Sequence, residues 1–170
     1  MDLRRYIRDI PDFPTPGILF KDITPLIKDP AAFQYAVDEI ARHYSEEPID
    51  VVVGIEARGF LFAAPLALKL KKPLVPVRKE GKLPFETHTV RYVLEYGESA
   101  VQVHIDAIEP RQRVLIVDDL LATGGTLEAA AKLVADTGGH VVGLAVVVEL
   151  TDLHGRERLS GHNILSLIQF

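Results

Sequence analysis

The sequence predicts an α/β fold in which a central, mostly parallel sheet is flanked by helices on both faces. Short apolar runs rich in β-branched residues at 49–55, 113–117 and 141–150 are typical of strands that are buried on both sides. Segments with helical periodicity separate these runs, and this alternation favours parallel pairing through helical crossovers. The length of 170 residues fits a single domain, 1–170.

The first predicted helix shows clear start signals. Asp29 is suited to an N-cap, Pro30 to the first helical position, and apolar residues then recur at helical spacing to about Tyr44. The other elements expected in the core are helices at 60–70, with Pro65 as a candidate kink, and at 127–135, strands at 74–77 and 164–168, and a helical turn near Asp152.

Residues 1–28 are expected to form an irregular but ordered N-terminal hood. Four prolines restrict the backbone there and block helix at the preceding residues: Pro11, Pro14, Pro16 and Pro25. The same segment contains several large apolar residues, so a disordered tail is not expected.

Residues 79–105 predict a β-ribbon that stands off the main sheet. A polar loop is expected at 79–89, and two strands at 92–94 and 101–105 are separated by a turn at 95–98.

Composition excludes several classes of function. The chain has no Cys, which rules out disulfides, thiolate catalysis and Cys-ligated zinc. The net charge of -5 argues against general binding to nucleic acid. The beginning of the chain lacks the apolar core of a signal peptide, and no apolar run approaches about 18 residues, so a cytoplasmic protein without a membrane span is expected.

The segment 114–126 carries the clearest chemical signal, because a strand, two carboxylates and a loop of small residues lead into a helix. Backbone N–H groups of the loop 122–126 would point from the positive end of that helix and form a cradle for a phosphate dianion. Asp118 and Asp119, at the carboxyl end of the strand, are suited to hold ribose hydroxyls. The predicted cradle residues are Ala122, Thr123, Gly124, Gly125 and Thr126.

A plainer interpretation is a helix N-terminus preceded by two solvated carboxylates. That interpretation would be preferred for a lone Asp-Asp pair, but it leaves the whole thirteen-residue pattern unexplained. The segment is neither a Walker loop, because no Gly-Lys-Ser/Thr follows, nor a dinucleotide fingerprint, because Gly-x-Gly-x-x-Gly is missing.

The segment 114–126 resembles the phosphoribosyl pyrophosphate (PRPP) motif of type I phosphoribosyltransferases. Four further stretches resemble the family of adenine phosphoribosyltransferases within that group: 13–23, 54–60, 78–84 and 94–97. The resemblance covers nearly the whole chain. It implies the type I phosphoribosyltransferase fold and purine salvage, in which adenine and PRPP give AMP and pyrophosphate.

The resemblance also implies roles for residues that would be ambiguous alone. Arg58 would lie in a pyrophosphate loop with a cis peptide at Glu56–Ala57. Arg78, Lys79 and Lys82 would bind pyrophosphate, with Lys82 acting in its own or a neighbouring subunit. A surface salt bridge or a solvated basic face is the structural alternative for these cations.

Leu19, Phe20 and Lys21 resemble the base-binding part of the hood, although Phe20 alone could be simple core. The ribbon would act as a lid, with Glu95 as acid/base and Tyr96 beside it. An ordinary hairpin tip is the alternative there. The family implies Mg²⁺ held mainly by PRPP rather than by protein ligands, and a homodimer.

Two departures from the family pattern concern packing rather than chemistry. Ala63 and Arg111 stand where Gly is common, the first near the pyrophosphate loop and the second in a surface turn. The alternatives that remain are another base, such as hypoxanthine, xanthine or orotate, and a PRPP-sensing regulator. No Lys occurs beyond Lys132, whereas enzymes for 6-oxo purines commonly place a Lys after the last core strands to donate to O6.

Overall fold

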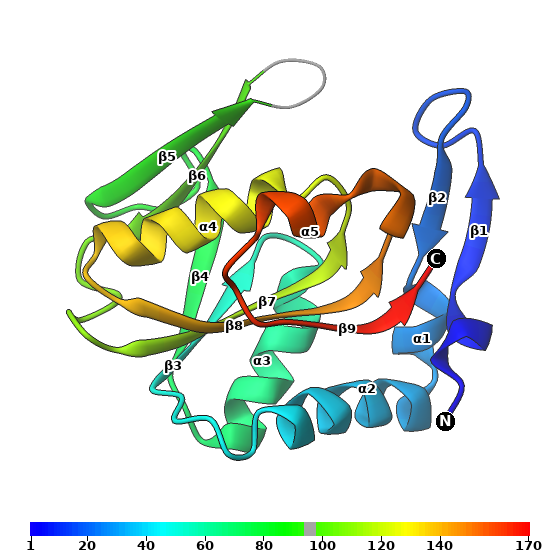
Figure 1. Cartoon of the computed structure of the whole chain (residues 1–170), viewed down its shortest axis with the longest axis horizontal. Coiled ribbons are helices and arrows are strands. Elements are labelled where there is room, and N and C mark those ends of the chain that lie inside the picture. Colours follow the sequence, from blue (N-terminus) through cyan, green and yellow to red (C-terminus); the bar gives the residue numbers. More distant parts are fainter. Residues whose placement is uncertain (94–97) are drawn as a thin grey trace.

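The computed structural model describes residues 1–93 and 98–170. In these residues a seven-stranded sheet has the order β5-β6-β4-β3-β7-β8-β9 (Figure 1). The five strands from β4 to β9 are parallel, whereas β6 is antiparallel to both β4 and β5. The sheet is therefore mostly parallel with an antiparallel edge, and the predicted fold class is confirmed.

The elements have the following bounds. The strands are β1 (Arg8–Pro11), β2 (Leu19–Asp22), β3 (Val51–Ile55), β4 (Leu74–Lys79), β5 (Thr87–Val93), β6 (Glu98–His104), β7 (Arg113–Leu121), β8 (His140–Glu149) and β9 (Ile164–Gln169). The α-helices are α1 (Thr24–Lys28), α2 (Pro30–His43), α3 (Gly59–Leu70), α4 (Gly125–Asp136) and α5 (Gly155–Arg158), and short 3₁₀ helices span Leu3–Tyr6 and Thr151–Leu153. Asp29 caps α2 as predicted, because its carboxylate accepts a hydrogen bond from the N–H of Ala32.

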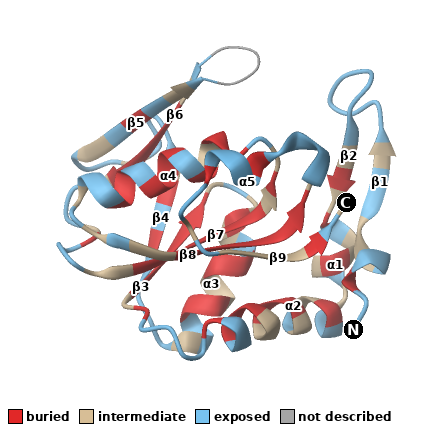
Figure 2. Cartoon of the chain, viewed as in Figure 1, coloured by how far each residue is buried: buried red, intermediate tan, exposed pale blue. Residues whose placement is uncertain are grey.

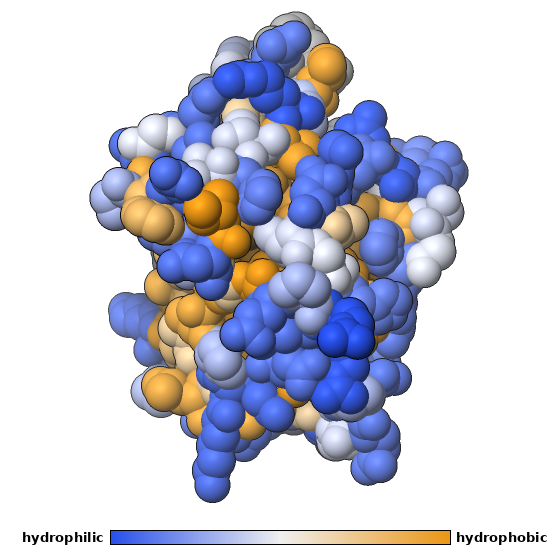
Figure 3. All heavy atoms as spheres, turned by 90° about the vertical axis from the view of Figure 1, so that its left-hand side faces the viewer, coloured by the Kyte–Doolittle hydropathy of each residue, from blue (hydrophilic) through white to orange (hydrophobic). Residues whose placement is uncertain are grey.

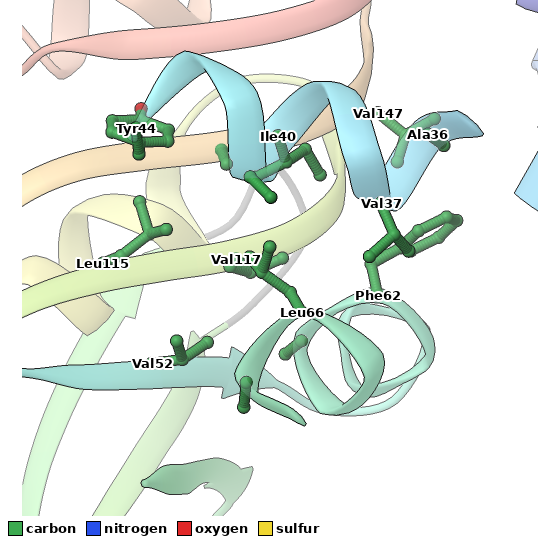
Figure 4. Close-up of a cluster of buried hydrophobic side chains, with 14 of the residues drawn as sticks. Ala36, Val37, Ile40, Tyr44, Val52, Phe62, Leu66, Leu115, Val117 and Val147 are labelled. Carbon is green, nitrogen blue, oxygen red and sulfur yellow. The ribbon is translucent and has the colours of Figure 1, made fainter. Parts of the chain in front are cut away.

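Both faces of the central strands are buried, as the apolar runs predict (Figure 2). Successive side chains of a strand point to opposite faces, so β7 contributes to two separate cores. Leu115 and Val117 pack with α2 and α3 on one face, where Phe62 and Leu66 are fully buried (Figure 4). Val114 and Ile116, which alternate with them on β7, pack with α4 on the other face. Helices therefore cover both faces of the sheet.

The hood is more regular than predicted. Strands β1 and β2 pair antiparallel, with Arg8 opposite Asp22 and Pro11 opposite Leu19 (Figure 1). Helix α1 begins one residue before Pro25, although proline was expected to block helix. The prediction of an irregular segment was wrong because proline is tolerated in a first helical turn and at the end of a strand.

The ribbon is also longer than predicted, and it is joined to the sheet. Strand β5 begins at Thr87, inside the expected loop 79–89, and β6 pairs with the end of β4 at Arg78 and Lys79. The beginning of β5 gives little hydrophobic signal in the sequence, because Val90 is the only buried residue of that strand.

The surroundings of Ala63 and Arg111, the two departures from the family pattern, are clear in the structure. Ala63 is fully buried, and its Cβ lies 2.7 Å from the place where a Cβ of Gly54 would be. The alanine therefore fits because residue 54 of β3 is glycine. Arg111 is exposed in a turn with φ 71°, which is a left-handed conformation that favours glycine.

We expect Arg111→Gly to stabilise the protein by about 0.5 kcal/mol. Relief of the left-handed strain of about 1 kcal/mol is partly offset by the larger entropy of glycine in the unfolded chain. Urea denaturation would measure the change. An unchanged or lower free energy of unfolding would contradict the strain at this turn.

The face that carries the N-terminal ends of β7 and β8 is mainly hydrophilic, with some apolar side chains gathered toward one side (Figure 3). Within residues 1–93 and 98–170, no helix is both long and apolar enough to cross a membrane.

Candidate active site

A cleft of 360 Å³ opens at the carboxyl ends of β3, β4 and β7. Open α/β sheets bind ligands at this end of their strands. Most of the predicted site residues line this cleft: Arg58, Arg78, Lys79, Asp118, Asp119, Ala122, Thr123, Gly124, Gly125 and Thr126.

Residues 122–126, the predicted cradle, connect the end of β7 to the start of α4. Strand β7 continues to Leu121, so the two aspartates lie within the strand rather than after it. Gly124 precedes α4 with φ 86°, and no side chain in the described part of the chain caps this helix. The first turn of α4 lines the cleft, and its N–H groups have no acceptor among the described residues, at the positive end of the helix dipole.

Two residues that the sequence did not single out contact this cradle. The hydroxyl of Tyr92, on β5, lies 3.2 Å from that of Thr126, which links the ribbon to the cradle. A Cβ at Gly125 would lie 2.9 Å from Nη1 of Arg158, so a guanidinium also lies beside the cradle. Neither residue belongs to a local motif, and only the fold brings them to the site.

Asp118 and Asp119 are buried beside one cation. Their exposed fractions are 9% and 5%. Oδ2 of Asp119 lies 2.9 Å from Nε of Arg58, in an ion pair whose angle does not make a hydrogen bond. This buried carboxylate oxygen therefore keeps the capacity to accept a hydrogen bond from a ligand.

Burial raises the pKa of both carboxyl groups. Burial, reinforced by the negative charge of Asp119, holds the pKa of Asp118 well above its usual range. Burial also raises the pKa of Asp119, although the Arg58 guanidinium opposes this rise. Two negative charges at this site are therefore costly until hydroxyl donors or a cation arrive.

We expect Asp118→Asn to raise the thermal stability of the protein at neutral pH. A carboxyl whose folded pKa is raised adds stability below its unfolded pKa, and this stability is lost as the pH rises through the folded pKa. The difference in Tm between variant and wild type should therefore be positive at pH 7 and shrink toward pH 4. A variant that melts below wild type at pH 7 would contradict the raised pKa.

The loop after β3 contains the cis peptide Glu56–Ala57 that the resemblance implied. Glu56 accepts hydrogen bonds from Nε and Nη2 of Arg78, both at 3.2 Å, and from the N–H of Lys79 at 2.9 Å. Burial acts to raise the pKa of Glu56, but the Arg78 and Lys79 hydrogen bonds outweigh it and lower the pKa. Sequence reasoning missed this role of Glu56, which fixes two of the predicted pyrophosphate residues.

Lys82 and the hood residues do not line the cleft. The backbone carbonyl of Lys82 accepts a hydrogen bond from Arg78. The guanidinium of Arg58 lies 5.0 Å from the ring centroid of Phe20, so the hood adjoins the β3 loop. The Lys21 ammonium is 2.7 Å from Asp9 and is buried, so its side chain holds the hood together. Glu95 and Tyr96 lie outside the described residues.

The cleft contains two carboxylates that could share a magnesium ion with a phosphate-bearing ligand. Within the described residues, no three His, Asp or Glu side chains cluster as a metal site. Asp118 and Asp119 provide two carboxylates, and Mg²⁺ commonly uses one or two together with substrate phosphates and waters.

Comparison with known proteins places the chain in one family. A family model described as "Phosphoribosyl transferase domain" matches residues 26–165. The adenine phosphoribosyltransferase of Symbiobacterium thermophilum is 54% identical over 170 residues, which cover 100% of both chains.

Solved structures agree with this assignment. The adenine phosphoribosyltransferase of Thermoanaerobacter pseudethanolicus has a TM-score of 0.97 at 52% identity, covering 99% of this chain and 98% of that one. The Saccharomyces cerevisiae enzyme, solved with adenine and an imino-altritol bisphosphate, has a TM-score of 0.92 at 39% identity, covering 98% and 96%. This chain belongs to the adenine phosphoribosyltransferase family.

Proposed function

We propose that this chain transfers the phosphoribosyl group of PRPP to N9 of adenine and so releases AMP and pyrophosphate. One observation carries the proposal. The cleft combines an anion cradle at the start of α4, the buried carboxylates of Asp118 and Asp119, and the cations Arg58 and Lys79. These groups match the 5′-phosphate, the ribose hydroxyls and the pyrophosphate of a single PRPP molecule.

In the proposed reaction, N9 of adenine bonds to C1 of the ribose while the bond from C1 to the pyrophosphate oxygen breaks. The proton of N9 leaves, and Glu95 assists this transfer. The 122–126 cradle holds the 5′-phosphate, and the two aspartates orient the ribose. Arg58, Arg78, Lys79 and Lys82 stabilise the departing pyrophosphate.

Arg58 must exchange partners for this role. It is paired with Asp119 and stacked near Phe20, and pyrophosphate would compete with both contacts. Bound Mg²⁺ would supply neutralisation of charge on the leaving group. Asp118 and Asp119 are the carboxylates placed to hold it, directly or through water.

The hood and the ribbon complete the proposed site. Backbone groups of Leu19, Phe20 and Lys21 bind adenine, and the position of Phe20 supports this because it lies next to Arg58, a residue that lines the cleft. The ribbon 79–105 acts as a lid, which excludes water that would otherwise hydrolyse PRPP. The contact between Tyr92 of the ribbon and Thr126 of the cradle supports this proposed role.

We further propose that the enzyme is a cytoplasmic homodimer. The large apolar side chains of Leu61 and Leu68, seven residues apart on α3, are 41% and 81% exposed, which supports a covered face there. No nucleic acid or membrane is proposed as a partner.

The function is tested by measuring pyrophosphate release and AMP formation with adenine, PRPP and Mg²⁺. Equal amounts of both products, with none when adenine is left out, are expected. Pyrophosphate release that is independent of adenine, or AMP that never forms, would overturn the proposal.

A further inference from the structure

Helix α5 forms a wall behind the phosphate cradle. Its first residue, Gly155, is buried, and a Cβ added to Gly124 would lie only 2.7 Å from the carbonyl oxygen of Gly155. A side chain at Gly155 would likewise collide with the carbonyl of Ala122. Because the backbones of α5 and the cradle touch directly, a shift of α5 must move or loosen the cradle.

An ion pair between a buried carboxylate and an arginine of α5 holds α5 against the sheet. Glu149, the last residue of β8, is 4% exposed. Its two carboxylate oxygens accept hydrogen bonds from Nε and Nη2 of Arg156, on α5, at 2.6 and 2.8 Å. Ser166 and Gln169, on β9, donate to the same carboxylate. The Arg156 hydrogen bonds are the largest cause of a lowered pKa of Glu149, so the carboxylate is charged at neutral pH.

The same glutamate lies level with the end of β7. Glu149 pairs with Leu121, the residue directly before the cradle, and the N–H of Leu150 donates to the carbonyl of Leu121 at 2.9 Å. Glu149, at the end of β8, is therefore paired with the end of β7 through Leu121 and with α5 through Arg156. Figure 1 shows α5 near the β7–α4 connection.

We propose that Glu149 and Arg156 are positioning residues for the phosphate cradle. They hold Gly155 in contact with Ala122 and Gly124, and so keep the cradle's N–H groups aimed at one phosphate. This inference rests on the proposed function, because it assumes that the cradle binds the 5′-phosphate of PRPP and AMP. Neither residue lines the cleft, so their removal should act only through the cradle, weakening phosphate binding and leaving the adenine side of the site unchanged.

The chain offers a matched control on the same sheet. Asp50 and Arg113 form another carboxylate–guanidinium pair with two hydrogen bonds, both at 2.8 Å. Arg113 is the first residue of β7, at the opposite end of the strand from the cradle. Loss of this pair changes the charge and the anchoring of β7 without touching α5.

The experiment compares Glu149→Gln and Arg156→Lys with Asp50→Asn. Calorimetry would measure the Kd for AMP and for ribose 5-phosphate, steady-state kinetics would give separate KM values for PRPP and adenine, and melting curves would monitor folding. For Glu149→Gln we expect the Kd of both phosphates and the KM for PRPP to rise roughly tenfold. The KM for adenine and kcat should stay within about twofold of wild type.

Arg156→Lys keeps the charge but cannot donate two parallel hydrogen bonds, so a smaller shift in the same direction is expected. It decides the question if Glu149→Gln does not fold. Asp50→Asn should leave phosphate binding unchanged. Unchanged phosphate affinity in both cradle-side variants, or an equal loss in Asp50→Asn, would overturn the positioning role. Failure of the wild type to bind ribose 5-phosphate would instead overturn the proposed function.

Discussion

Replacing Asp119 with Asn is expected to leave a folded protein whose turnover falls roughly 10²-fold, the usual cost of losing one preorganised electrostatic contact. Oδ2 of Asp119 is buried, accepts no hydrogen bond from the described residues and faces Arg58 at 2.9 Å. The amide would remove the charge that holds this guanidinium and would replace one acceptor oxygen with a donor. Rapid-quench and steady-state kinetics would separate the loss of turnover from a loss of binding.

Asp50→Asn is the natural control for this experiment, because it removes a carboxylate that also pairs with an arginine but lies away from the cleft. It should keep near-normal turnover. Near-normal turnover in Asp119→Asn would instead remove Asp119 from the catalytic site. A matching decrease in both variants would show a general effect on the fold.

Gly125→Val is expected to lower the affinity for PRPP by roughly 10² to 10³-fold while the protein still folds. The new Cβ would meet Nη1 of Arg158 at 2.9 Å and the ring of Tyr92 at 3.4 Å. Arg158 can move because this atom is the end of a flexible side chain. The branched side chain would then occupy the space beside the first N–H groups of α4, where the phosphate is proposed to bind.

Calorimetry with PRPP would measure this effect, and melting curves would show whether the variant folds. Gly125→Ala provides a graded control, because a single methyl group should have a smaller effect than valine. Undiminished affinity for PRPP in folded Gly125→Val would disprove the phosphate-cradle assignment.

The sequence was sufficient where a function depends on consecutive residues. The segment 114–126 predicted both the strand-to-helix connection and the clustering of its residues in the cleft, and the structure agrees. Hydrophobic runs predicted the buried parallel strands equally well, because burial on both faces leaves a continuous apolar signal.

The remainder depends on pairing between distant segments. The strands of the hood were missed because Arg8–Pro11 and Leu19–Asp22 pair with each other across the chain, through contacts such as the Lys21–Asp9 ion pair that a local sequence pattern does not reveal. Glu56, Tyr92 and Glu149 were missed for a related reason. Each acts through a contact that exists only in the folded state: Glu56 on Arg78 and Tyr92 on Thr126, both far along the chain, and Glu149 on Arg156, seven residues away.

Specificity for the base follows from the hydrogen-bonding pattern that each purine presents. Adenine presents a donor at its 6-amino group and an acceptor at N1, whereas hypoxanthine presents the reverse pair at O6 and N1. Backbone groups of Leu19–Lys21 that fit adenine would therefore leave unpaired polar groups with hypoxanthine, which discriminates strongly. The chain also has no Lys beyond Lys132 to donate to O6.

The most direct test of the central claim is a side-by-side assay of pyrophosphate release with adenine, hypoxanthine, guanine and xanthine at equal PRPP. We predict that kcat/KM for adenine exceeds that for each 6-oxo purine by roughly 10⁴-fold, as expected when a mismatched base leaves buried polar groups unpaired. Comparable efficiency with hypoxanthine would contradict the assignment of adenine as the substrate.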